Sequence, residues 1–520
     1  MQKLVLCILD GCGIRESSDG NAFKNANKKT LDMLFNKYPH SILQASGKAV
    51  GLPEGQMGTS EVGHMNIGSG RIAMQPLERI TSSIEDKSFF ENGKIIDVLN
   101  HVKKNNSFLH IFGLLSDGGV HSHINHALAL LDMCKKYDVK NVVFDICLDG
   151  RDTYEKSALK YIEQLNNKIK EVGIGCIGTI SGRYYGMDRD NNFDRLKLAY
   201  DAIVYGNADK YNSYNELIEN SYKNGIYDEF VKPGLINCIP LNDNDGIITF
   251  NFRKDRLREL FTLLSNPSEY EENANEKNLH VKHFNNLKVL TMFPVTETVT
   301  CPHVYDDLDL KNILVDYLHD KGISQLRIAE TEKYPHVTFF FDGGKEINYD
   351  DMKKVLIPSP KVATYDLKPE MSVYEVTDNF LKEVENYDVT IMNLANGDMV
   401  GHTGVYEKAK EAVEHMDKCI KKIYDKVMEL DGILIIIADH GNCDMMWDSN
   451  HNPVTSHTTN PVPCIITKEN IKLNNGVLAD IAPTMLDLMG LPIPGEMTGK
   501  SLIIKWLNFV KNVDFMFLIW

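Results

Sequence analysis

Short apolar runs rich in β-branched residues recur along the chain, and each ends abruptly in a polar residue before an amphipathic segment. The run 3–9 ends at Asp10, and the run 433–437 ends just before Asp439. Continuous apolar strands that alternate with amphipathic helices, such as 408–430, are typical of parallel sheets covered by helices on both faces. The pattern therefore predicts an α/β protein with mainly parallel sheets and more than one sheet. Further strands are predicted at 108–115, 142–148, 174–180, 247–252 and 389–394.

Acidic and imidazole side chains gather where these strands end, which is where α/β sheets bind ligands. Asp398 and His402 are four residues apart, so a helix there would place both on one side. Carboxylates and imidazoles in this combination suit two divalent ions such as Mn²⁺ or Zn²⁺. The candidate ligands are Asp10, Asp398, His402, Asp439, His440 and His457.

A hydroxyl beside such a cluster would equip the protein for phosphoryl transfer, because two metal ions can activate the nucleophile and clamp the leaving oxygen. The candidate is Ser60, which lies between Gly58 and Gly63 in a segment where backbone can approach a phosphate closely. A serine that caps a helix, with Glu61 in the first turn, explains the same residues equally well. The local sequence leaves both possibilities open.

Composition excludes several classes of protein. The chain has 520 residues, 43% of them hydrophobic and 25% charged, as expected for a globular protein of about two to four domains. A net charge of −16 argues against a nucleic-acid partner. Ten scattered cysteines without a C-x-x-C pair fit a reducing compartment, and the first apolar run is too short for a secretory signal. We therefore expect a cytoplasmic protein.

Arginine is unevenly distributed and indicates a domain boundary. The chain has 11 arginines against 45 lysines, yet seven of the 11 lie within 151–258. A planar guanidinium binds carboxylate or phosphate through two parallel hydrogen bonds, so this stretch is expected to bind an anion. The metal-ligand candidates lie outside it, towards both ends of the chain. We predict an outer domain formed by 1–75 and 303–505, and an inserted domain at 76–302.

The last residues form an additional tail at 506–520. The segment 502–520 is apolar but carries Lys505, Lys511 and Asp514, which a membrane-spanning helix would exclude. We predict a docked terminal helix, with contact at a membrane surface as the alternative, and no stable insertion into a membrane.

Ten motifs resemble the cofactor-independent phosphoglycerate mutase family, in that family's order and over nearly the whole chain. They are G-T-S-E-V-G-H (58–64), S-D-G-G-V-H-S-H (116–123), D-G-R-D-T (149–153), G-R-Y-Y-G-M-D-R-D (182–190), N-F-R-K-D-R (251–256), Q-L-R-I-A-E-T-E-K-Y-P-H-V-T-F-F-F (325–341), V-A-T-Y-D-L-K-P-E-M (362–371), D-M-V-G-H-T-G (398–404), A-D-H-G-N (438–442) and S-H-T-T-N-P-V-P (456–463). The resemblance implies an alkaline-phosphatase-like outer domain with an inserted phosphotransferase domain. It also implies interconversion of 3-phosphoglycerate and 2-phosphoglycerate in glycolysis and gluconeogenesis, without a bisphosphoglycerate cofactor.

The resemblance also implies roles for individual residues. Ser60 would be the nucleophile that becomes phosphoserine, and Asp152 would move protons on and off the substrate hydroxyls. One metal ion would be bound by Asp398, His402 and His457, and the other by Asp10, Ser60, Asp439 and His440. The substrate would be bound by His121, Arg151, Asp152, Arg183, Arg189, Arg253, Arg256 and Lys333. Mn²⁺ is the expected ion, with Mg²⁺, Co²⁺ and Zn²⁺ open because mixed nitrogen and oxygen ligands accept several metals.

Four positions depart from the family pattern, although none is a ligand or the nucleophile. They are Thr59 for Asn, Lys254 for Pro, Phe193 for Trp and Gly397 for Pro. A phosphatase or another phosphomutase on the same metal core remains an alternative, as does an inactive metal-binding or anion-binding module. A sulfatase is disfavoured because no C-x-P-x-R sequence supplies its nucleophile. We expect a monomer whose inserted domain closes over the metals and excludes water, because water would convert a mutase into a phosphatase.

Three histidines among the ligands make metal binding sensitive to acid, because a protonated imidazole cannot coordinate a metal ion. At a limiting concentration of metal ion we expect activity to fall as the pH is lowered from 8 to 6. A pH–activity profile at limiting metal checks this. A flat profile at limiting metal would contradict the assignment.

Overall fold

The computed structural model describes residues 2–308 and 310–504, and the fold divides into two compact units. Unit 1 comprises Met1–Gln75 and Leu310–Trp520, and unit 2 comprises Pro76–Asp309. The chain therefore returns from unit 2 to unit 1 after Asp309, whereas the sequence analysis placed this boundary after 302. The predicted tail at 506–520 lies outside the described residues.

Backbone pairing explains why the second boundary lies later than expected. The amide of Val304 donates to the carbonyl of Thr291 at 2.8 Å, and the amide of Tyr305 donates to the carbonyl of Met292 at 2.9 Å. These bonds extend one edge of the unit 2 sheet, so the segment after 302 belongs to that unit.

The core of unit 1 is an eight-stranded sheet. Its order is β11 (Met352–Ile357), β10 (Gln325–Glu330), β12 (Val389–Leu394), β1 (Leu4–Leu9), β13 (Ile433–Ile437), β14 (Val462–Ile466), β2 (His40–Gln44) and β15 (Gly476–Val477). The first five strands in this order are parallel, and β14 is antiparallel to both of its neighbours. All residues of β1, β12 and β13 are buried, because helices cover both faces of the sheet.

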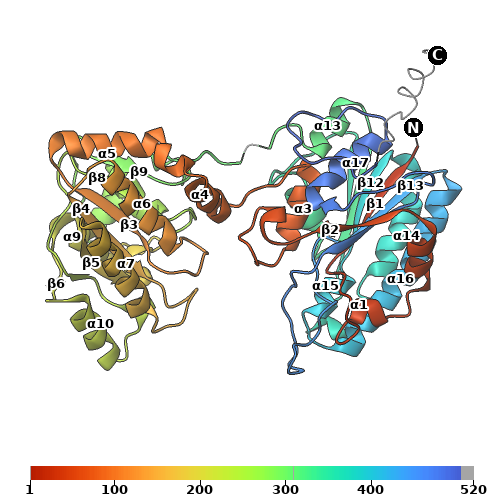
Figure 1. Ribbon diagram of the computed structural model, residues 1–520, viewed down its shortest axis with the longest axis horizontal. Helices are drawn as coiled ribbons and strands as arrows, with labels where there is room; N and C mark the ends of the chain where they lie inside the picture. Colours follow the sequence, from red (N-terminus) through yellow and green to blue (C-terminus); the bar gives the residue numbers. More distant parts are fainter. Residues whose placement is uncertain (1, 309, 505–520) are drawn as a thin grey trace, which may run out of the picture. The chain divides into compact units, whose positions relative to one another are not determined.

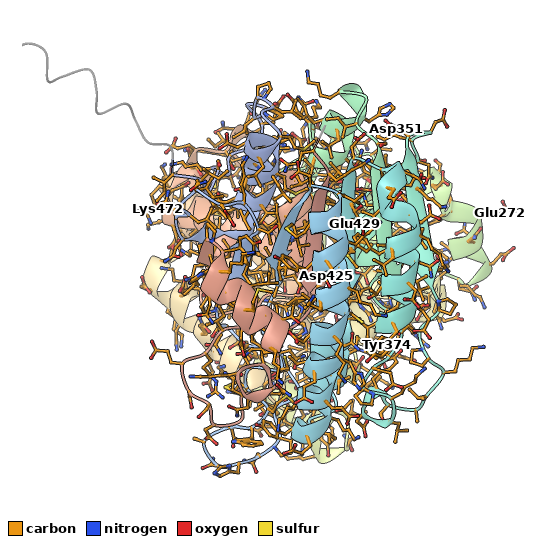
Figure 2. All side chains as sticks on the ribbon, turned by 90° about the vertical axis from the view of Figure 1, so that its right-hand side faces the viewer. Glu272, Asp351, Tyr374, Asp425, Glu429 and Lys472 are labelled. Carbon is orange, nitrogen blue, oxygen red and sulfur yellow. The ribbon has the colours of Figure 1, made fainter. Side chains whose placement is uncertain are left out.

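Helices cover the two faces of this sheet, with α14 and α16 on one side and α3 on the other (Figure 1). Helix α16 buries Ala409, Val413, Met416 and Ile420, which lie three or four residues apart on one face. Figure 2 shows α14 and α16 in front of the strands, with Asp425 on the outward side of α16. The helices of unit 1 are α1 (Ala22–Asn25), α2 (Lys29–Lys37), α3 (Ser60–Ser69), α13 (Leu314–Asp320), α14 (Val373–Glu383), α15 (Asn396–Gly401), α16 (Tyr406–Glu429) and α17 (Ile481–Leu488).

Unit 2 contains a seven-stranded sheet with a packed core on each face. On β3, Leu109 and Ile111 belong to one hydrophobic cluster, and Phe112 and Leu114 belong to the other. The strand order is β6 (Asp209–Lys210), β7 (Gly234–Leu235), β5 (Cys176–Gly182), β4 (Val142–Leu148), β3 (Leu109–Leu114), β8 (Gly246–Thr249) and β9 (Lys288–Leu290). Only the pair β5–β7 is antiparallel among the paired strands of this sheet.

Both sheets are flanked by helices, so the predicted α/β class with two mainly parallel sheets is confirmed. The helices of unit 2 are α4 (Pro76–Glu85), α5 (Gly93–Asn105), α6 (Ile124–Lys136), α7 (Ala158–Val172), α8 (Arg183–Gly186), α9 (Phe193–Tyr205), α10 (Tyr214–Lys223), α11 (Arg258–Ser265) and α12 (Glu271–Glu276). Within 2–308 and 310–504, no helix combines the length and the apolar character needed to cross a membrane.

One buried carboxyl group makes the stability of unit 1 dependent on pH. Glu330 ends β10 with 1% of its surface exposed, and its carboxylate accepts a hydrogen bond from the hydroxyl of Ser359 at 2.9 Å. Burial raises the pKa of Glu330 from 4.5 to about 7. The folded state therefore binds this proton more tightly than the unfolded state, and the free energy of unfolding falls as the pH rises from about 4.5 to about 7.

We expect Glu330→Gln to remove this dependence, because glutamine does not titrate. Between pH 4.5 and 7.5 the difference in free energy of unfolding between the variant and the wild type should shift by about 3 kcal/mol in favour of the variant. Urea unfolding at several pH values measures it, with Glu54→Gln at an exposed position as the control. A difference that stays constant over this range would show that Glu330 is not a buried acid of raised pKa.

Candidate active site

The candidate residues of unit 1 meet at the carboxyl ends of β10, β12, β1 and β13, which are neighbours in the sheet. Parallel strands end at the same edge, so residues hundreds of positions apart in the sequence come together there. Asp10 follows β1, Lys333 follows β10, and Asp439 follows β13. The other members of the group are Ser60 at the start of α3, Asp398 and His402 of the α15 segment after β12, His440 after β13, and His457 in the loop before β14.

Two imidazoles and one carboxylate form the first cluster. The Nδ1 atoms of His402 and His457 donate to the carbonyls of Thr455 at 2.6 Å and Gly58 at 2.8 Å. A carbonyl only accepts, so each Nε2 keeps a lone pair when the ring is neutral. Both Nε2 atoms lie 3.2 Å from Oδ1 of Asp398 and 3.0 Å from each other. Acceptors that converge in this way need a cation between them, so this cluster fits a metal ion.

Within this cluster the carboxylate and the imidazoles each stabilise the charged form of the other. A hydrogen bond to Asp398 raises the pKa of His402. The pKa of His457 is also raised, because burial alone would lower it but the interaction with Asp398 is stronger. Burial alone would raise the pKa of Asp398, but Lys333 and the two imidazoles hold it well below its usual range. The carboxylate therefore stays ionised although only 2% of the residue is exposed.

A second cluster surrounds the hydroxyl of Ser60. Its Oγ lies 2.9 Å from Nε2 of His440 and 3.3 Å from Oδ1 of Asp10. The Oδ2 atom of Asp439 is buried without a hydrogen-bond partner, 3.6 Å from Nε2 of His440. Burial and the charge of Asp439 raise the pKa of Asp10. Burial would also raise the pKa of Asp439, but His440, His64 and Lys333 lower it below its usual value. An orphaned carboxylate oxygen among these donors fits a second cation.

Lys333 bridges the two clusters. Its Nζ lies 2.7 Å from Oγ of Ser60, 2.8 Å from Oδ1 of Asp10 and 2.6 Å from Oδ2 of Asp398. Burial would lower the pKa of Lys333, but the surrounding carboxylates raise it, so the side chain remains an ammonium ion. The residue lies just before η5 (His336–Phe340), a π-helical turn of the kind often found at functional sites.

The cap of helix α3 decides between the two interpretations of Ser60. The side-chain oxygen of Thr59 accepts a hydrogen bond from the amide of Val62 at 3.3 Å, so Thr59 is the N-cap. Ser60 is the first helical residue, and its hydroxyl therefore points into the cluster instead of capping the helix. The alternative of an N-cap serine is wrong.

In unit 2, the anion-binding candidates also follow the ends of parallel strands. Arg183 has 1% of its surface exposed, and its Nη1 lies 2.7 Å from Asp149 and 2.6 Å from Asp152. The Nε atoms of Arg183 and Arg256 are buried without hydrogen-bond partners, which suits an anion that would accept from them. The set comprises His121 after β3, Arg151 and Asp152 after β4, Arg183 and Arg189 after β5, and Arg253 and Arg256 after β8.

Asp255 holds three members of this set and was missed in the sequence analysis. Its carboxylate lies 3.0 Å from Arg189, 3.2 Å from Arg253 and 3.6 Å from His121. Burial and the charge of Arg183 lower the pKa of His121 to about 4, so its imidazole is neutral near pH 7. The available signal was the acidic residue between the two arginines of N-F-R-K-D-R. Asp149 in D-G-R-D-T was missed in the same way.

Arg151 is far more exposed than Arg183. Its side chain is 57% exposed and pairs with Glu229 at 3.2 Å, whereas Asp152 pairs with Arg183. The sequence analysis placed Arg151 in one set with Arg183, but the turn after β4 directs Arg151 towards solvent. Arg189 and Arg253 are also largely exposed. Any contact of Arg151 with an anion would therefore require little desolvation.

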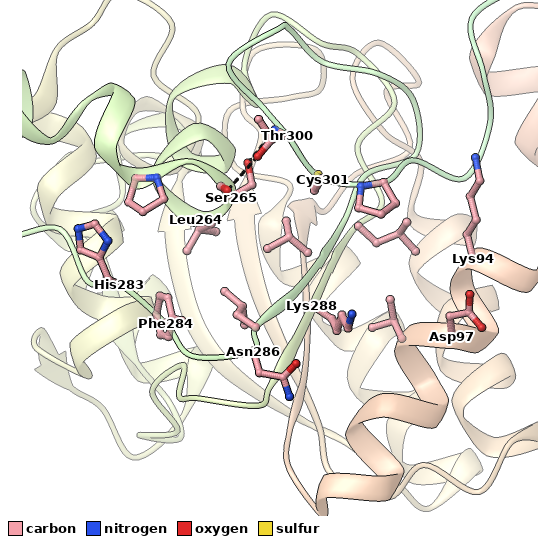
Figure 3. Close-up of a pocket in the computed structure, with 16 residues that line it drawn as sticks. Lys94, Asp97, Leu264, Ser265, His283, Phe284, Asn286, Lys288, Thr300 and Cys301 are labelled. Carbon is pink, nitrogen blue, oxygen red and sulfur yellow. Dashed lines mark hydrogen bonds between the residues drawn. The ribbon is translucent and has the colours of Figure 1, made fainter.

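A cavity of about 540 Å³ lies elsewhere in unit 2, beside the edge strand β9 (Figure 3). Lys94, Asp97 and Phe284 are among the residues that line it, and none of the predicted site residues does. The Thr300 hydroxyl donates to the carbonyl of Ser265 at 3.0 Å and closes one side. This cavity is separate from the clusters described above.

Comparison with known proteins agrees with the geometry. A model of the metalloenzyme superfamily matches residues 2–493, and this is the class that the fold and the ligand clusters define. The chain is 50% identical over 516 residues to the 2,3-bisphosphoglycerate-independent phosphoglycerate mutase of Acetivibrio thermocellus, covering 97% of this chain and 99% of the relative. It is 50% identical over 514 residues to the protein of the same name from Clostridium novyi, covering 96% and 99%. The chain therefore belongs to the 2,3-bisphosphoglycerate-independent phosphoglycerate mutase family.

A solved structure supports the same assignment. The structure of Leishmania mexicana phosphoglycerate mutase at low cobalt concentration matches with a TM-score of 0.60 and 26% identity. The match covers 97% of this chain and 98% of that chain. The predicted family and its fold are confirmed.

The close approach of α3 to the strand end after β13 predicts an unusual effect of a glycine substitution. Gly63 lies inside α3, where alanine normally stabilises a helix by about 1 kcal/mol. Here a Cβ would lie 2.8 Å from the carbonyl oxygen of Asp439. We expect Gly63→Ala to lower the free energy of unfolding by about 1–3 kcal/mol, because α3 must move away.

Gly93→Ala is the matched control, since Gly93 lies at the start of α5 and a Cβ there would contact nothing within 4 Å. Urea unfolding should show no loss of stability in the control. Equal effects of the two substitutions would mean that α3 does not pack on Asp439 as described.

Proposed function

We propose that the chain interconverts 3-phosphoglycerate and 2-phosphoglycerate through a phosphoserine at Ser60, without bisphosphoglycerate. In this proposal unit 1 binds two divalent metal ions and unit 2 binds the substrate. The enzyme would act as a cytoplasmic monomer in glycolysis and gluconeogenesis. The observation that carries the proposal is the position of the Ser60 hydroxyl within the second cluster, 2.9 Å from Nε2 of His440, with the ammonium of Lys333 at 2.7 Å.

The ligands are assigned to two ions by the clusters described above. Asp398, His402 and His457 would bind one ion, and Asp10, Ser60, Asp439 and His440 the other. Bound ions would lower the pKa of the serine hydroxyl and neutralise charge on the phosphoryl group. Mn²⁺ is the proposed metal, although the donors also suit Mg²⁺, Co²⁺ and Zn²⁺. The related Leishmania mexicana structure was determined at low cobalt concentration, which supports a transition metal here.

The protein's own groups prepare Ser60 for attack on phosphorus. Oδ1 of Asp10 accepts a hydrogen bond from the Ser60 hydroxyl. Ser60 is the first residue of helix α3, which fixes the direction of the Ser60 Cβ. Nζ of Lys333 donates to Oγ of Ser60 and would stabilise negative charge on the phosphoryl oxygens during transfer. These groups are already in place in the folded chain, so little reorganisation is needed at the moment of reaction.

The arginines of unit 2 would hold the carboxylate and hydroxyls of glycerate while the phosphoryl group is on Ser60. Asp152 is the proposed proton carrier, because its Oδ2 lies 2.6 Å from Arg183 and 3.9 Å from His121 and its side chain remains 17% exposed. A carboxylate placed in this way can take a proton from one hydroxyl and return it to the other.

Phosphorus NMR with 3-phosphoglycerate and Mn²⁺, without bisphosphoglycerate, tests the proposal. The wild type should produce 2-phosphoglycerate, and Ser60→Ala should reduce the rate by at least about 10³-fold because it removes the nucleophile. Release of inorganic phosphate by the wild type would instead identify a phosphatase.

Ser69→Ala is the matched control, because Ser69 is a buried serine at the other end of the same helix. It should keep mutase activity within about threefold of the wild type. Equal activity of Ser60→Ala and the wild type would contradict the phosphoserine route.

A further inference from the structure

A third group of potential metal ligands overlaps the second cluster. Asp10, His64 and Asp439 offer ligand atoms within 4.8 Å of one another, and all three residues are buried. His64 lies one helical turn after Ser60 on α3 and has none of its surface exposed. The sequence analysis gave it no role, although it ends the motif that contains Ser60. Its position raises the question whether it binds a metal ion or acts through its neighbours.

Hydrogen bonds occupy both nitrogens of His64. Nδ1 lies 2.8 Å from the carbonyl oxygen of Ser60, which can only accept, so Nδ1 carries the proton. Nε2 lies 3.1 Å from the amide nitrogen Nδ2 of Asn393, which can only donate. The neutral ring therefore has one fixed tautomer, and no lone pair remains for a metal ion. Nδ1 also lies 3.3 Å from Oδ2 of Asp439.

Asn393 extends this contact to a proposed metal ligand. It lies near the end of β12 and is fully buried, and its Nδ2 donates a second hydrogen bond to Oδ2 of Asp10 at 2.7 Å. The two hydrogens of one amide nitrogen are thus divided between His64 and Asp10. If Nε2 of His64 could not accept, the amide would lose one of the two bonds that hold it in this orientation.

The resulting chain of hydrogen bonds runs from the Ser60 carbonyl through His64 and Asn393 to Asp10. It connects three elements: α3 begins with the nucleophile Ser60, β12 contains Asn393, and Asp10 of the second cluster follows β1. We propose that His64 and Asn393 are positioning residues that set the distance between Ser60 and Asp10, and that His64 is not a metal ligand. This inference rests on the proposed two-metal function. Asn393 directs the free lone pairs of Asp10, and His64 holds both Asn393 and the first turn of α3.

Two substitutions at His64 separate its two contacts. Asparagine places an amide near the position of Nδ1, so His64→Asn can still donate to the Ser60 carbonyl but cannot accept from Asn393. Glutamine reaches the position of Nε2, so His64→Gln can accept from Asn393 but cannot donate to the Ser60 carbonyl. A purely structural histidine would be affected similarly by both.

Titration of the metal-free protein with Mn²⁺ alone, with free Mn²⁺ measured by electron paramagnetic resonance, gives the affinity and the number of ions bound. His64→Asn should bind its weaker ion at least tenfold less tightly, because Asn393 no longer orients Asp10. His64→Gln should bind Mn²⁺ within about threefold of the wild type, yet its kcat at saturating Mn²⁺ should fall by at least tenfold. Both variants should still bind two ions per chain.

Asn393→Leu provides an independent check through a double-mutant cycle. It should weaken Mn²⁺ binding as much as His64→Asn, and the double variant should bind no more weakly than either single one, since both act through the bond to Asp10. Asn396→Leu is the matched control, because Asn396 is buried and its amide donates two bonds, at 2.9 Å each, to the carbonyls of Pro369 and Glu370. It should keep the Mn²⁺ affinity within about twofold.

The outcomes distinguish this inference from its alternatives. Loss of one bound ion in both His64 variants would make His64 a ligand and overturn the proposal. Equal loss of affinity in His64→Asn and His64→Gln, or no change in either, would also overturn it. Near-ultraviolet circular dichroism identifies any variant that fails to fold. If a His64 variant fails to fold, the Mn²⁺ affinity of Asn393→Leu tests the proposal instead. If the wild type bound Mn²⁺ but made no 2-phosphoglycerate, the proposed function would fail while the positioning role could still be tested.

Discussion

The structure of unit 1 depends on the repulsion between three buried carboxylates at the end of one sheet. Asp10, Asp398 and Asp439 follow three adjacent strands, and none has more than 2% of its surface exposed. Three negative charges in such a place would unfold the strand ends unless cations were close. Lys333 contacts Asp10 and Asp398 directly, and the imidazoles of His64 and His440 lie beside the third carboxylate, Asp439. The same excess of negative charge that costs folding energy would favour the binding of divalent metal ions.

Unit 2 has the opposite arrangement on a similar sheet. There the strand ends carry arginines, and Asp149, Asp152 and Asp255 balance them. Two guanidinium Nε atoms remain buried without partners, so the balance is incomplete and favours an anion. Polar residues that follow apolar parallel strands would thus form a cation site in one unit and an anion site in the other. The close packing at these ends allows no extra atom, since a Cβ on Gly11 would lie 2.6 Å from the backbone of Asp398.

Several of the strands whose two faces are both buried were predicted from the sequence, although β10 and β14, which are equally buried, were not. The sequence located β1, β4, β12 and β13 within a residue or two, because apolar residues dominate them, although Asp145 lies within β4 and Asn393 within β12. It missed β10, whose apolar run is broken by the buried residues Gln325 and Arg327, and β11, which is an edge strand with exposed Leu356. The metal-ligand candidates were identifiable by residue type. Asp255 had a local signal in its place between two arginines. His64 and Asn393 were not identifiable, because their contacts join elements that only the tertiary fold brings together.

The number of bound metal ions tests the central claim most directly, namely that the buried carboxylates form two separate cation sites. Elemental analysis of protein dialysed against Mn²⁺ should find two ions per chain in the wild type. His402→Ala and His440→Ala should each retain one ion, because each removes a ligand from a different cluster. Fewer than two ions in the wild type, or two ions in both variants, would contradict the account.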